Sequence, residues 1–141
     1  MKKITTYLFA IAFTFASCNK SVKSRLPGSW IITSQNVKTS QTVGGNTQTS
    51  DNTSAGGNYT FNSNGTGTTN NTDNGKTTSF TWVATENSIT FTDSEGSYAV
   101  TVVTNEKKKQ KWTFDYSMSY NDPFVGQISQ KVSGTIEVAK Q

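Results

Sequence analysis

The stretch WTFDYSMSY, residues 112–120, carries a large apolar side chain at every second position. One face of this segment holds Trp112, Phe114, Tyr116, Met118 and Tyr120, and the other holds Thr113, Asp115, Ser117 and Ser119. Successive side chains of a strand point to opposite faces, so this period of two predicts a β-strand with one buried face.

Further strand-like segments, most of them with the same alternation, lie on both sides of residues 112–120 and are separated by clusters of Asn, Asp, Ser and Gly. These segments are residues 30–33, 59–62, 66–69, 80–85, 89–92, 98–103 and 128–138. Asn64-Gly65 is a hairpin signal, because a type I′ turn needs positive φ angles that both residues tolerate. Gly134, inside the last segment, is expected to mark a bulge or a bend. Seven or eight antiparallel strands joined by short turns predict an all-β fold, a meander that closes into a small β-barrel or forms a sandwich.

Residues 35–58 form a long polar stretch with few aliphatic side chains, among them Val37 and Val43. The first strand could continue toward Val43. The remainder is expected to be a mobile loop, because it has little apolar surface to bury.

The N-terminus has the pattern of a secretory signal peptide. Lys2 and Lys3 precede a mostly apolar run over residues 7–16, and small residues lead up to Cys18. The run is too short for a membrane span, which needs about 20 apolar residues. Residues 15–18 (FASC) resemble a bacterial lipobox, and this resemblance implies that Cys18 becomes the lipidated first residue of the mature chain. The alternative is an ordinary secreted protein with a free thiol, which is a liability in an oxidising compartment.

The sequence therefore divides into a signal peptide at residues 1–17, a lipidated tether at 18–25 and one β-domain at 26–141. Two of the 13 basic residues leave with the signal peptide, so 11 basic residues face 9 acidic ones. A nearly neutral mature chain gives no electrostatic reason to expect a nucleic-acid partner.

The chain has no histidine and one cysteine, so His-based acid–base catalysis, Ser–His and Cys–His pairs and ordinary zinc sites are excluded. We expect no enzyme activity, no catalytic residue, no cofactor and no metal site. The carboxylates that remain are Glu86, Asp93, Glu95 and Asp115, and each is expected to be solvated at the surface. Residues 62–65 and 72–75 weakly resemble calcium loops but lack the carboxylates, so hairpin turns are favoured.

Two further groups of side chains allow a structural and a functional interpretation. Residues 107–109 with Lys111 could attract anionic headgroups or glycans, but a solvated hairpin tip is favoured. The candidate ligand-lining residues are Trp82, Trp112, Phe114 and Tyr116. Such aromatic side chains could line an apolar pocket or fill the interior of a small barrel, and packing in the core is favoured.

The order of these elements resembles the lipocalin-like domains carried by many Bacteroidetes lipoproteins. Gly28-Ser29-Trp30 matches the Gly-x-Trp motif of lipocalins, with Gly28 and Trp30 as the motif residues. Residues 59–66 match an aromatic hairpin with Asn-Gly-Thr, and residues 80–91 match an aromatic strand followed by Asn-x-Ile-Thr-Phe.

This resemblance implies a lipocalin-like barrel anchored to the bacterial outer membrane through Cys18, with a small hydrophobic ligand in the barrel mouth under the loop at 35–58. It also implies an arginine of the last strand over Trp30. The arginine of this chain is Arg25, just before the motif, so Lys131 or Lys140 would have to take this role. Since residues 19–21 lack the acidic residues of surface-exported lipoproteins, a periplasm-facing position is expected. The alternative is a structural or interaction lipoprotein with a filled core that contacts glycan or another envelope protein. The sequence identifies neither the ligand nor the oligomeric state.

Overall fold

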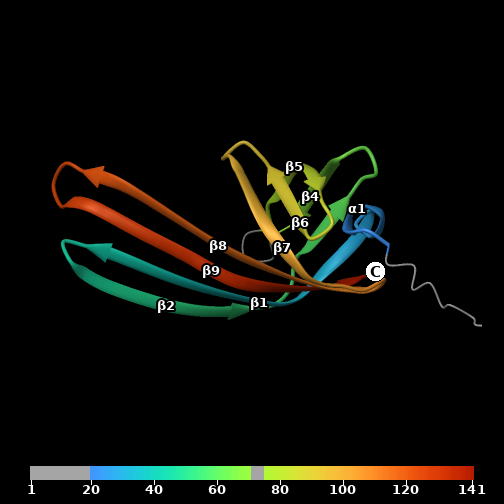
Figure 1. The fold of residues 1–141 in the computed structure, drawn as a ribbon, viewed down its shortest axis with the longest axis horizontal. Helices are drawn as coiled ribbons and strands as arrows, with labels where there is room; N and C mark the ends of the chain where they lie inside the picture. Colours follow the sequence, from blue (N-terminus) through green and yellow to red (C-terminus); the bar gives the residue numbers. More distant parts are fainter. Residues whose placement is uncertain (1–19, 71–74) are drawn as a thin grey trace, which may run out of the picture.

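The computed structural model of the protein describes residues 20–70 and 75–141, most of which belong to one antiparallel sheet (Figure 1). The predicted signal peptide, Cys18 and most of the 72–75 turn lie outside the described residues. The elements are α1 (Val22–Arg25), β1 (Gly28–Val43), β2 (Asn46–Ser54), β3 (Asn58–Phe61), β4 (Thr66–Asn70), β5 (Thr77–Ala84), β6 (Ser88–Thr92), β7 (Ser97–Asn105), β8 (Lys109–Asp122) and β9 (Gly126–Lys140).

The sheet closes into a barrel because β1 pairs with both β3 and β9. Its first residues, Gly28 to Ile31, pair with β3, while the strand from Trp30 onward also pairs with β9. From β3 to β9 every strand pairs with its successor, so eight strands form an antiparallel meander barrel and β2 lies outside it. The predicted all-β barrel of seven or eight strands is confirmed.

The expected mobile loop at residues 35–58 was wrong, because most of this segment forms a long hairpin. β1 continues to Val43, Gly44 and Gly45 make the turn at positive φ, and β2 pairs with β1 over its whole length. All residues of β2 are exposed. A strand with no buried face has no hydrophobic alternation, and this is why the sequence pattern does not reveal it.

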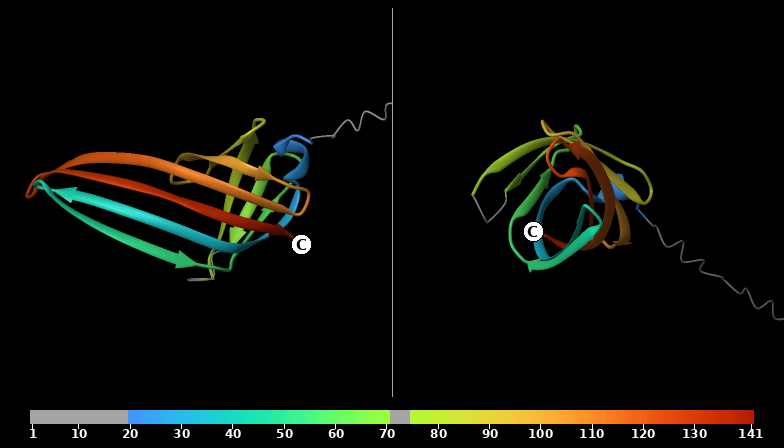
Figure 2. Two further views of the ribbon diagram at one scale, coloured as in Figure 1. Left: turned by 60° about the horizontal axis from the view of Figure 1, so that its bottom comes forward. Right: turned by 90° about the vertical axis from the view of Figure 1, so that its left-hand side faces the viewer.

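The two longest hairpins extend far beyond the barrel and form what we call the extension. It consists of residues 35–43, 46–54, 114–122 and 126–134, in the strand order β2-β1-β9-β8. β8 pairs with β7 only as far as Thr113, so beyond this residue its outer edge has no described partner strand. Figures 1 and 2 show the hairpin tips at the end of the molecule opposite to α1.

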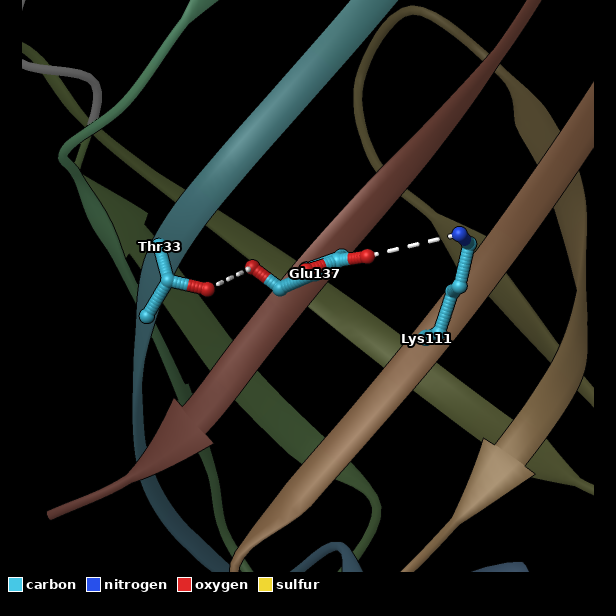
Figure 3. Close-up of polar contacts among 3 residues, drawn as sticks. All are labelled: Thr33, Lys111 and Glu137. Atoms are coloured by element: carbon cyan, nitrogen blue, oxygen red, sulfur yellow. Dashed lines mark hydrogen bonds and ion pairs between the residues drawn. The ribbon is translucent and has the colours of Figure 1, made fainter.

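A β-bulge at Thr33 decides which side chains of β1 face inward in the extension. The register with β9 shifts between Ile32 and Ser34, and the Thr33 hydroxyl donates to the main-chain oxygen of Glu137 at 3.1 Å (Figure 3). The Glu137 carboxylate in turn lies 3.3 Å from the Lys111 ammonium group on β8. Because one extra residue inverts the alternation, Ile32 points into the barrel and Lys38 points outward.

Gly134 does not mark a bulge, since its register with β1 and β8 is continuous. A Cβ atom there would lie 2.1 Å from the main-chain oxygen of Asn36 and 2.7 Å from the Phe114 ring. The predicted irregularity is thus a close approach of β1 and an aromatic ring, which only glycine permits.

The end of the barrel opposite to the extension is closed by α1. Val22 and Leu26 are fully buried in the barrel core, and Ser21 caps the helix by accepting from the Ser24 N–H. The C-terminal part of the segment expected as a polar tether, residues 18–25, therefore belongs to the folded domain.

Candidate binding surface

The interior of the barrel is filled by aromatic side chains. The Phe61 ring lies 5.5 Å from Phe80, 5.6 Å from Trp82, 5.9 Å from Phe91 and 6.1 Å from Trp112, measured between centroids. These distances fall in the favourable range for edge-to-face and tilted ring pairs. All five side chains are buried, so the interior is a packed core at this level.

Each of the three tryptophans also has an internal partner for its indole N–H. Trp30 donates to the Leu26 carbonyl at 2.7 Å, Trp82 to the Thr66 carbonyl at 3.0 Å and Trp112 to the Gln110 side-chain oxygen at 2.9 Å. A buried indole that is already satisfied has no donor left for a ligand. This places two of the four candidate ligand-lining residues, Trp82 and Trp112, in the structural core.

Gln110 is the buried polar residue that holds Trp112 in place. Its side chain is fully buried, accepts from Trp112 and donates to the Asn105 side-chain oxygen at 2.8 Å. Asn105 then donates to the Lys20 carbonyl at 3.1 Å and accepts, at its own carbonyl, from the Arg25 guanidinium. This chain of hydrogen bonds ties β7 and β8 to the segment that leads into the barrel.

Lys140 caps Trp30 at the closed end of the barrel. Its ammonium nitrogen lies 5.2 Å from the centroid of the Trp30 ring and donates to the carbonyls of Arg25 and Pro27 at 2.9 and 2.7 Å. Burial lowers the Lys140 pKa. Of the two lysines expected from the sequence for this position, Lys140 occupies it, and the salt bridge of Lys131 to Asp115 places that lysine elsewhere.

A cavity of about 360 Å³ lies at the mouth, where the barrel meets the extension. The large apolar side chains of the lining are Ile32, Val37 and Tyr59. The rest of the lining is mostly amide and hydroxyl side chains. The full lining is Ile32, Gln35, Val37, Thr39, Ser50, Asn52, Ser54, Gly56, Tyr59, Thr69 and Asn70. Such a lining suits a polar or amphipathic group better than an alkyl chain.

The cavity opens onto one face of the extension, which we call the aromatic face. Register and alternation place on it Phe114, Tyr116, Met118, Tyr120, Asp122, Gly126, Ile128, Gln130, Val132, Gly134, Gln35, Val37, Thr39, Gln41, Val43, Asn46, Gln48, Ser50, Asn52 and Ser54. The face is exposed along its outer strand, since Tyr116, Met118 and Tyr120 are 44%, 48% and 52% accessible. The predicted burial of one complete face of residues 112–120 therefore holds only where the strand belongs to the barrel, at Trp112 and in part at Phe114.

The opposite face, which we call the hydroxyl face, carries four of the five charged side chains of the extension. Lys38 lies opposite Asp51 in the register, and Lys131 lies 3.2 Å from Asp115. Serine and threonine fill most of the remaining positions, and a shallow hollow of about 280 Å³ lies above these short side chains. The charged residue of the aromatic face is Asp122 at the tip of β8, and its carboxylate accepts from the Phe124 and Val125 amides of the turn.

Two tyrosines near the mouth have a raised pKa. Burial is the main cause for Tyr59, partly offset by a side-chain hydrogen bond with Thr69. Burial is also the first cause for Tyr98, followed by the neighbouring Tyr59, Asp93 and Tyr116. Both phenols stay neutral well above physiological pH, so they act as hydrogen-bonding groups and not as anions.

The other predicted surface residues lie in turns and on outer faces. The Asp93 carboxylate accepts from the Glu95 and Gly96 amides, which fixes the β6–β7 turn. Residues 106–108 form the turn between β7 and β8, as expected for the charged tip. Within residues 20–70 and 75–141 no group of three acidic, histidine or cysteine side chains is arranged to hold a metal ion.

The residues that sequence reasoning missed are the uncharged polar side chains of the aromatic face. Gln41 and Gln48 belong to the stretch interpreted as a loop, and Gln130 lies between the buried residues Ile128 and Val132 of the last strand. The signal that could have found this surface is the alternation in residues 112–120, which is longer than a barrel of this size can bury.

Comparison of the chain with protein-family models, with characterised proteins and with solved structures found no match. Among the described residues no helix has the length and apolar character needed to cross a membrane. The fold class, a small antiparallel β-barrel with a buried aromatic core, therefore comes from the structure itself.

Proposed function

We propose that this protein is a lipid-anchored lipoprotein of the bacterial envelope that binds a partner through its extension and does not transform it chemically. The observation that carries the proposal is the contrast between the two halves of β8. Trp112 is fully buried among packed rings, whereas Tyr116 and Tyr120 on the same strand face are half exposed beyond the barrel. An exposed aromatic row of this kind marks an interaction surface.

The described chain begins at the end of the molecule opposite to the extension. Cys18 precedes Lys20 by two residues, and Lys20 leads into α1 at the closed end of the barrel. The hairpin tips lie at the other end (Figure 1). On this proposal the barrel is a spacer that holds the aromatic face away from the anchoring bilayer.

The lipocalin-like character of the barrel belongs to the same proposal. Gly28 and Trp30 open the first strand, and Lys140 of the last strand covers the Trp30 ring, as in the lipocalin pattern. An outer-membrane, periplasm-facing position follows from the lipobox and the absence of acidic residues at 19–21.

A second candidate is the small hydrophobic ligand expected from the lipocalin resemblance. The mouth cavity supports it, since Ile32, Val37 and Tyr59 contribute to the lining and about 360 Å³ can hold a small molecule. The mostly polar remainder of that lining favours the interaction lipoprotein over this candidate.

The anchor is tested by expressing the full chain in a bacterium and separating membrane and soluble fractions. We expect a lipidated product that pellets with the membranes, and a Cys18→Ala variant that is neither acylated nor pelleted. Lys23→Ala, a substitution of an exposed residue of α1, is the matched control and should behave like the wild type. A Cys18→Ala product that still pellets, with the mass of the acylated form, would refute the lipoprotein.

A further inference from the structure

The distribution of charge in the extension is unequal between two faces that are both accessible. Four of its five charged side chains at strand positions belong to the hydroxyl face, namely Lys38, Asp51, Asp115 and Lys131. The fifth, Asp122, ends β8 on the aromatic face, where its carboxylate accepts from two amides of the turn that follows. Burial does not explain this, because Tyr116, Met118 and Tyr120 on the aromatic face are about half exposed. A partly accessible face whose one carboxylate lies at the tip and is already hydrogen-bonded in the turn matches an uncharged partner, since an ionic partner would leave its charges unpaired along the rest of the face.

The aromatic face combines two kinds of group in a regular order. Tyr116 and Tyr120 are four residues apart on β8, which separates their rings by roughly 13 Å along the strand. Between them, the register aligns Met118 with Gln130, Gln130 with Gln41, and Gln41 with Gln48. Three carboxamides therefore form one row across β9, β1 and β2, at a strand spacing of about 4.8 Å.

The glutamine row has unused hydrogen-bonding capacity. No side-chain hydrogen bond connects Gln41, Gln48 or Gln130 to another residue of the described chain. Each carboxamide offers two N–H donors and an oxygen acceptor. A ligand with alternating donors and acceptors can satisfy this row, whereas an alkyl chain laid over it would leave the amides unpaired.

We propose that the aromatic face binds a neutral oligosaccharide chain, with sugar rings stacked on Tyr116 and Tyr120 and sugar hydroxyls paired with the glutamine row. A pyranose ring has an apolar C–H face that packs on an aromatic ring, and its hydroxyl groups donate and accept like the carboxamides. The mouth cavity, which continues this face with Asn52, Ser50 and Thr39, extends the site toward the barrel. This inference rests on the proposed interaction lipoprotein and names the class of its partner.

Other occupants fit these observations less well. An anionic glycan or a nucleic acid would need cations, but Lys38 and Lys131 lie on the opposite face. A lipid surface would need apolar contact and would leave the glutamine row unpaired. A second copy of the chain could add to the unpaired edges of β2 and β8, and this possibility is decided by the test below.

The test is isothermal titration of the full, processed protein with neutral hexaoses of the cello-, xylo-, manno- and malto- series, and with an oligogalacturonate as the anionic probe. We expect saturable binding of at least one neutral hexaose. Tyr116→Ala, Tyr120→Ala and Gln130→Leu should each weaken it by about fivefold to tenfold, while Tyr116→Phe, which keeps the ring, should retain most of it. Ser117→Ala and Ser119→Ala, on the same strand but on the hydroxyl face, should leave the affinity unchanged.

Several results would overturn the proposal. These are absence of binding to every neutral hexaose at millimolar concentration, binding only to oligogalacturonate, binding that responds to the serine variants and not to the tyrosine variants, and a dimer in sedimentation that Tyr116→Ala dissociates. Far-ultraviolet circular dichroism verifies that each variant is folded. If anchoring through Cys18 holds while hexaose binding fails, the ligand class is wrong and the lipoprotein proposal stands.

Discussion

A double-mutant cycle on Gln110 and Trp112 measures how firmly Trp112 is held as a core residue. Gln110→Leu removes the acceptor of the buried Trp112 indole N–H and the donor to Asn105. A buried polar group left unpaired costs about 1–3 kcal/mol, so we expect this variant to lose about 2 kcal/mol of unfolding free energy. Trp112→Phe leaves the Gln110 side-chain oxygen unpaired and removes part of a packed ring, for an expected loss of about 3 kcal/mol.

The double variant lacks both members of the hydrogen bond, so the cost of an unpaired group is not incurred twice. Its destabilisation should be smaller than the sum of the single effects by about 1–2 kcal/mol. Equilibrium unfolding in urea, followed by far-ultraviolet circular dichroism, gives the three values. Trp82→Phe combined with Gln110→Leu is the control pair and should be additive, because Trp82 donates to the Thr66 carbonyl instead. Additivity of the Gln110–Trp112 pair within about 0.5 kcal/mol would show that the buried hydrogen bond is not what positions Trp112.

Three further predictions concern the stability of the folded protein. Gly134→Ala should lower the unfolding free energy by about 1–3 kcal/mol, because the new Cβ atom would collide with the Asn36 carbonyl. Ser133→Ala, at the neighbouring position, should change the unfolding free energy by less than about 0.5 kcal/mol. Urea unfolding measures both variants, and equal effects would contradict the close approach at Gly134. Lys140→Met removes two hydrogen bonds to carbonyls and the contact with the Trp30 ring, so we expect the unfolding free energy to fall by about 1–3 kcal/mol. A variant as stable as the wild type in urea unfolding would contradict the role of Lys140 as a cap on Trp30. Because the Tyr59 pKa is raised, the unfolded chain releases the phenol proton near the ordinary pKa of 10.0 while the folded protein retains it. The free energy of unfolding should therefore fall as the pH rises above about 10. Tyr59→Phe should make this fall shallower in urea unfolding at alkaline pH. An unchanged alkaline slope in Tyr59→Phe would contradict the burial of this phenol.

The barrel was predictable because most of its strands have one buried and one exposed face. Phe80, Trp82, Ile89 and Phe91 alternate with threonine and serine in the sequence, and the structure buries all four. Asn64-Gly65 predicted a turn, and Gly65 adopts the positive φ that the turn needs. In these segments the sequence pattern and the tertiary environment agree.

The extension was not predictable in the same way, since its hydroxyl face is solvated and its aromatic face is buried only in places, as at Ile128 and Val132. β2 has only exposed residues and is held by its hydrogen-bonded ladder with β1, which leaves no hydrophobic period in the sequence. The exposure of Tyr116 and Tyr120 depends on where β8 parts from β7, which is a property of strand pairing over long sequence distances. The bulge at Thr33 likewise inverts the alternation of β1 and cannot be located from residue types alone.

The filled interior is the claim on which the assignment of binding to the extension depends. All three tryptophans of the chain are buried in that interior, so their fluorescence reports directly on any ligand that enters it. We therefore propose to titrate the processed protein with palmitate, retinol and haem while following tryptophan emission. We predict no saturable change with any of the three probes; saturable quenching that Trp112→Phe abolishes, in a variant that remains folded, would show that the barrel has an interior ligand site.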